Sequence, residues 1–89
     1  MNGEDFKVWL ETSRMLSPSS VKHYYGAIET LRNELPSWGL ESKDLFAMTD
    51  DSYIDEILDN SSFQEKNKRG HNMYSAALNH LREYIRTTK

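Results

Sequence analysis

The segment Lys66-Asn67-Lys68-Arg69-Gly70-His71-Asn72 holds the richest set of side chains that could bind a ligand. Lysine and arginine pair with phosphate, and histidine and asparagine can reach base edges in a nucleic-acid groove. A helix is expected directly after the segment, and the first backbone N–H groups of a helix form an anion site. Gly70 lets the chain approach a ligand closely. The pattern predicts phosphate contacts, with a solvated basic helix flank as the alternative interpretation.

A smaller set of the same kind surrounds the start of an earlier helix. Ser17 and Pro18 mark this start, because serine caps a helix and proline favours its first position. The side chains predicted to contact phosphate here are Ser19, Ser20, Lys22 and His23. An ordinary solvent-facing surface is again the alternative.

The histidine spacing does not predict a metal site. His71 and His80 are nine positions apart on one expected helix, whereas two ligands on one helix face need a spacing of four. His23 belongs to another helix. No other nucleophilic or titratable groups converge, and a bundle of this size has little room for a catalytic pocket. We therefore expect a chain that is not an enzyme and holds no metal or cofactor.

Charge is distributed unevenly along the 89 residues, whose formal net charge is −3. Residues 1–40 hold four basic and five acidic side chains, residues 41–65 one and eight, and residues 66–89 six and one. These parts therefore carry net charges of −1, −7 and +5. The overall acidity weakly disfavours a nucleic-acid partner, but the chain ends in a basic block that follows an acidic one.

The acidic block does not have the pattern of a cation site. Its acids between positions 50 and 59 are Asp50, Asp51, Asp55, Glu56 and Asp59. They lack the glycine-centred loop and the closing glutamate of a helix-loop-helix calcium site. We expect a solvated helix face.

The composition indicates one small core that is stabilised by packing alone. The sequence has no cysteine, so it offers neither a disulfide nor a thiolate metal ligand. Ten aromatic residues, 2 Trp, 5 Tyr and 3 Phe, supply the apolar area. No apolar run has the length of a signal peptide or a membrane span. We expect a single cytoplasmic domain over residues 1–89, without membrane contact.

The hydrophobic periodicity predicts helices and no sheet. Long helices are expected over about 4–14, from Pro18 until just before Pro36, and over about 71–86. A short turn is expected within 42–48, a helix capped by Thr49 follows it, and Ser62 is expected to open a further turn. On the last helix, Tyr84 is expected at the edge of the apolar stripe. The fold class is therefore all-α, a four- or five-helix orthogonal bundle.

Three groups of residues at helical spacing resemble a known family. They are Phe6-x-x-Trp9-Leu10, Ser17-x-x-Ser20-Val21-x-x-Tyr24-x-x-Ala27-Ile28 and Asn72-x-x-Ser75-Ala76-Ala77-Leu78-x-x-Leu81-x-x-Tyr84-Ile85. The pattern resembles the SAM-like N-terminal core-binding domain of phage integrases and other tyrosine recombinases. The segment 63–78 is also similar to N-terminal modules that precede nuclease or McrB-like GTPase domains in bacterial restriction systems.

This resemblance implies a SAM-like helical bundle that clamps duplex DNA while a separate downstream domain performs the chemistry. The residues that it places against phosphates and groove edges are Ser19, Ser20, Lys22, His23, Lys68, Arg69, His71 and Asn72. Lys66, Arg82 and Arg86 add backbone-positioning charge. The acidic surplus departs from the basic character usual in that family.

We therefore expect a non-catalytic DNA-binding accessory domain, the N-terminal part of a larger bacterial recombinase- or restriction-type protein. The alternative is a protein-interaction module that self-associates through its acidic middle and basic C-terminal surfaces.

Overall fold

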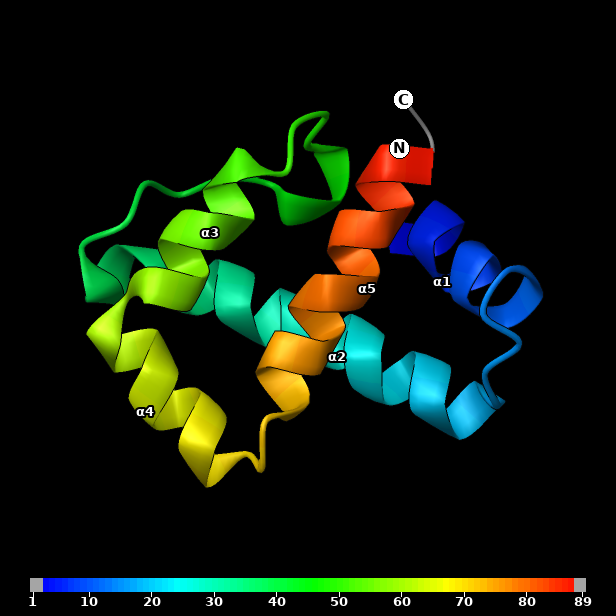
Figure 1. Cartoon of the computed structure of the whole chain (residues 1–89), viewed down its shortest axis with the longest axis horizontal. Coiled ribbons are helices and arrows are strands. Elements are labelled where there is room, and N and C mark those ends of the chain that lie inside the picture. The colour runs from blue at the N-terminus through cyan, green and yellow to red at the C-terminus, as the bar shows by residue number, and fades with distance from the viewer. Residues whose placement is uncertain (1–2, 88–89) are drawn as a thin grey trace.

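The computed structural model describes residues 3–87, and this part of the chain is helical and contains no strand (Figure 1). Its elements are α1 (Gly3–Thr12), α2 (Pro18–Glu34), the 3-10 helices η1 (Leu35–Trp38) and η2 (Leu45–Ala47), α3 (Ser52–Asp59), α4 (Ser61–Arg69) and α5 (Met73–Thr87). The prediction of an all-α bundle with four or five helices is confirmed. No helix within the described residues is both long enough and apolar enough to cross a membrane.

The two longest helices, α2 and α5, cross in the centre of the molecule and make the most extensive contact between helices. α1 packs near one end of this crossing, and α3 and α4 cover the other side (Figure 1). Every helix contributes to one core, whose fully buried larger side chains are Phe6, Leu10, Ile28, Leu31, Leu35, Leu45, Ile54, Ile57, Phe63, Leu78, Leu81 and Ile85. Residues 3–87 therefore share a single hydrophobic core.

The ends of α2 follow from its sequence as predicted. The Ser17 hydroxyl accepts a hydrogen bond from the Ser20 N–H at 3.3 Å, and Pro18 occupies the first helical position. At the other end α2 stops at Glu34, shortly before Pro36. Gly39 then adopts a left-handed conformation, with φ of 77°, and closes η1.

Two predicted caps are wrong by a few residues. Thr49 does not cap α3; instead, the Asp50 carboxylate accepts a hydrogen bond from the Ser52 N–H at 2.8 Å. Ser62 does not open α4, because the Asn60 side chain already accepts from the Phe63 N–H at 3.1 Å. Asn60 thus ends α3 and begins α4, which leaves no loop between the two helices.

The α5 helix also differs from its prediction at two points. It starts at Met73 rather than near His71, because His71 and Asn72 are left-handed, with φ of 55° and 66°. Tyr84 belongs to the core rather than to its edge. Its ring packs against Phe6 and Trp9, with centroids 5.5 and 5.6 Å apart, because α1 covers this end of α5.

Replacement of the shared cap tests this arrangement. Asn60→Ala should lower the free energy of unfolding by about 1 kcal/mol or more, because the Asn60 amide also donates to the Trp38 carbonyl at 3.2 Å. Ser62→Ala is the matched control and should change stability little. Urea denaturation measures both, and equal effects of the two substitutions would contradict the assigned cap.

Candidate nucleic-acid interface

The bend between α4 and α5 is fixed by hydrogen bonds within the chain. The Asn67 side-chain oxygen accepts from the Ser75 N–H at 2.9 Å, and so ties the end of α4 to the start of α5. The Asn72 N–H donates to the Asn67 carbonyl at 2.8 Å. A Cβ on Gly70 would lie 2.8 Å from the Tyr74 ring, so a glycine is needed at this position because of the aromatic side chain.

The start of α5 is less open to an anion than its sequence suggests. Of its first backbone donors, the Met73 N–H bonds to the Gly70 carbonyl at 3.1 Å and the Ser75 N–H bonds to Asn67. These two backbone N–H groups therefore already donate to acceptors of the same chain and are not available for phosphate. The side chains of the bend remain the better candidates for contacts.

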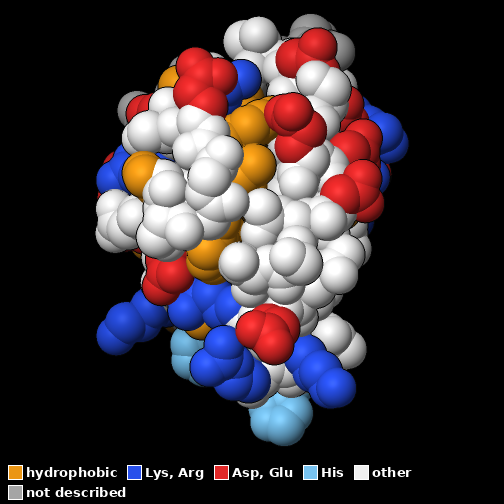
Figure 2. Space-filling model, turned by 90° about the vertical axis from the view of Figure 1, so that its left-hand side faces the viewer, with side chains coloured by type: hydrophobic (Ala, Val, Ile, Leu, Met, Phe, Trp, Pro, Cys, Tyr) orange, Lys and Arg blue, Asp and Glu red, His pale blue; other side chains and the backbone are white. Residues whose placement is uncertain are grey.

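Four predicted contact residues are exposed together at this bend: Lys68, Arg69, His71 and Asn72. Lys68 and Arg69 make no ion pair with any residue between 3 and 87. On the face of the molecule shown in Figure 2, most Lys, Arg and His side chains lie at the lower end, whereas most Asp and Glu side chains lie above them. The bend thus presents two exposed cations that form no ion pair with a carboxylate of the described residues.

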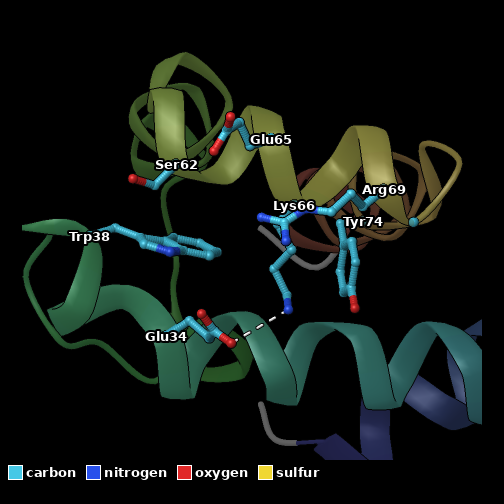
Figure 3. Close-up of a pocket in the computed structure, with 8 residues that line it drawn as sticks. Glu34, Trp38, Ser62, Glu65, Lys66, Arg69 and Tyr74 are labelled. Atoms are coloured by element: carbon cyan, nitrogen blue, oxygen red, sulfur yellow. Dashed lines mark ion pairs between the residues drawn. The ribbon is translucent and has the colours of Figure 1, made fainter.

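The Lys66 side chain points in a different direction, into a groove between α4 and the end of α2 (Figure 3). Its ammonium lies 3.4 Å from the Glu34 carboxylate and 5.2 Å from the centre of the Tyr74 ring. Glu34 is the last residue of α2, where the helix dipole is negative, so Lys66 stabilises that end of the helix. Trp38 forms the opposite wall of the groove, whose volume is about 600 Å³.

Sequence reasoning missed this groove. Glu34 and Trp38 are about thirty positions away from Lys66 and about forty from Tyr74 along the chain, and no local pattern joins them. The aromatic side chains could be read only as packing residues. Only the position of α4 beside the end of α2 brings them together.

Arg82 and Arg86 lie on the C-terminal half of α5, away from the bend, and both pair with carboxylates of the α3 region. Arg86 Nε is 2.7 Å from Asp51, and Arg82 forms an ion pair with Asp55. The acidic and basic blocks of the sequence therefore meet inside one chain. Side-chain exposure of Asp51 is only 21%, so this pairing is partly protected from solvent.

The predicted residues at the start of α2 form a second exposed cluster. Ser19, Lys22 and His23 are exposed, and Ser20 is half-buried. Neither Lys22 nor His23 makes an ion pair within the described residues. Fourteen residues of helix separate Ser20 from Glu34, which corresponds to about 20 Å along the axis of α2. The cluster therefore lies far from Glu34 and from the groove at the end of α2.

His80 is half-buried beside this second cluster and packs against the Tyr24 ring, with centroids 4.7 Å apart. Burial lowers the pKa of His80 below its usual value, and the positive charge of Arg14 lowers it further. The neutral imidazole is therefore favoured in the folded chain. No group of three or more metal-ligating side chains occurs among residues 3–87.

Comparisons with models of protein families, with curated proteins and with solved structures found no match to this chain. The geometry of the site and the residue pattern described above therefore form the basis for a functional proposal.

The environment of His80 predicts a loss of stability in acid. Because the pKa of His80 is lower in the folded chain, its contribution to stability is full above about pH 6.5 and is lost as the pH falls through the folded-state pKa. His80→Gln should reduce the loss of unfolding free energy between about pH 7.5 and pH 5.5. His23→Gln, at an exposed position, is the control. Urea denaturation at both pH values measures the effect, and identical losses in wild type and His80→Gln would refute it.

Proposed function

We propose that this chain is a non-catalytic DNA-binding domain that contacts the backbone of duplex DNA. The observation that carries the proposal is the pair of exposed cations Lys68 and Arg69, which make no ion pair within residues 3–87, on a bend of fixed geometry. Phosphate contacts of this kind position a protein on DNA without reading its sequence. His71 and Asn72 lie next to them and can reach base edges in a groove.

The cluster at the start of α2 provides a second point of contact. Along the axis of α2, Ser20 of this cluster lies about 20 Å from Glu34, which lines the groove between α2 and α4. Two clusters on different elements, the start of α2 and the α4–α5 bend, can contact the DNA backbone at two points. Ser19 and Ser20 would donate hydrogen bonds, and Lys22 would supply charge.

The distribution of ion pairs supports weak rather than tight binding. Lys66, Arg82 and Arg86 are already paired with carboxylates of the same chain. Lys22, Lys68 and Arg69 remain as the main phosphate contacts. Because each neutralised phosphate contributes about −0.9 to the salt slope, three contacts correspond to a slope of about −3.

Weak binding fits an accessory role in a larger protein. The likeness to the core-binding domain of recombinases, and to N-terminal modules of restriction systems, supports a parent protein that supplies catalysis from a downstream domain. In that arrangement this domain adds affinity and orientation through its effective concentration near the DNA.

Self-association is the competing function, and the internal ion pairs reduce its support. It was expected to use the acidic middle of one copy against the basic end of another. In the structure Asp51 and Asp55 instead pair with Arg86 and Arg82 of their own chain. Sedimentation without nucleic acid distinguishes the two functions, because concentration-dependent dimers would favour self-association.

Two double variants that each remove two positive charges test the DNA proposal. Lys68→Gln with Arg69→Gln should weaken binding to a short labelled duplex about tenfold at low salt and reduce the salt slope by about two. Arg82→Gln with Arg86→Gln should weaken it much less, because those arginines are paired internally. Fluorescence anisotropy measures both. Equal losses would show a general charge effect, and no binding by the wild-type chain would refute the proposal.

A further inference from the structure

The groove between α2 and α4 combines three kinds of chemistry in one place (Figure 3). Trp38 from η1 and Tyr74 from α5 are aromatic side chains on its two sides. Glu34 and Glu65 provide carboxylates, and Lys66 and Arg69 provide cations from one face of α4. Carboxylates accept hydrogen bonds, aromatic faces stack with flat rings, and cations pair with anions, so the groove fits a ligand with all three complementary features.

The present partners of these groups show which of them a ligand can use. The Lys66 ammonium lies over the face of the Tyr74 ring, 5.2 Å from its centre, so this face points into the groove and becomes available when Lys66 moves away. The Lys66 and Glu34 side chains, 26% and 39% exposed, form an ion pair accessible to solvent. Such a pair contributes little stability and can exchange partners. Glu65 and Arg69 are exposed and make no ion pair within residues 3–87.

A nucleotide has the three features in one molecule. Its base is flat and stacks on aromatic side chains, the amino groups of cytosine, adenine and guanine donate hydrogen bonds, and its phosphate is an anion. Double-stranded DNA buries the faces of its bases in the stack, so only an unpaired nucleotide could enter. The groove opens beside Arg69, which also belongs to the exposed cations of the bend.

We propose that this groove binds one unpaired, amino-bearing nucleotide of a DNA strand, an inference that rests on the DNA-binding function proposed above. The base stacks on Tyr74 beside Trp38, and its amino group donates to Glu34 or Glu65. Lys66 leaves Glu34 and pairs with the phosphate together with Arg69. The ion pair of the free protein is thus exchanged for one contact to the base and one to the phosphate.

Short single strands of oligo(dC) and oligo(dT) test the inference, because thymine lacks the amino group. At about pH 7.5 the wild-type chain should bind oligo(dC) about fivefold more tightly. Glu34→Ala and Glu65→Ala should reduce this preference, whereas Glu11→Ala, which removes an exposed carboxylate of α1 outside the groove, should leave it unchanged. The ratio of the two affinities separates base recognition from any general effect of charge.

Removal of the aromatic surface is the second test. Tyr74→Leu should weaken single-strand binding at least about fivefold through lost stacking and change duplex binding less than twofold. Tyr74→Phe keeps the ring and should bind as the wild type does, and circular dichroism checks that each variant is folded. Equal binding of the two oligonucleotides, or a Tyr74→Leu variant with unchanged single-strand affinity, would overturn the inference. If duplex binding survives either result, the function proposed above still stands; if the chain binds no DNA, both fail.

Discussion

The crossing of α2 and α5 is the contact on which the rest of the structure depends. Both helices bury small residues in the core, Ala27 on α2 and Ala77 on α5, and every other element contributes a larger apolar side chain. Each shorter helix packs against this pair or against a helix that does, so no part of the core forms without it. A chain of this size buries a modest fraction of its surface, and loss of this crossing would leave too little packing to offset the entropy of folding.

Electrostatics acts as a second, weaker organising force. Asp51 and Asp55 of the acidic block pair with Arg86 and Arg82 of the basic block, which joins α5 to α3 and the residue before it and neutralises two arginines. Lys68 and Arg69 at the α4–α5 bend and Lys22 at the start of α2 are among the cations that make no ion pair within residues 3–87. Under the proposed DNA-binding function, such a surface would contact the polyanion at a few points instead of along a continuous basic face, as an accessory role requires.

The groove differs from the bend in what it could recognise. The bend presents cations to any phosphate, whereas the groove places aromatic rings and carboxylates beside two cations. Its occupant in the free chain is the chain's own Lys66, held by Glu34 and Tyr74. This ion pair satisfies both charged groups in the free chain, and the proposed nucleotide would replace it with a contact to the base and one to the phosphate.

The sequence by itself determined the features that depend on nearby residues. The periodicity of apolar side chains predicted the helices, and Ser17, Pro18 and Pro36 fixed the limits of α2, because capping and proline sterics act within a few positions. Alternative caps such as Asn60 and Ser62 were too similar in type for sequence to choose between them. Only the tertiary structure decided which charges are paired, that Tyr84 is buried, and that Trp38 and Tyr74 share a groove, because these facts depend on contacts between residues far apart in the chain.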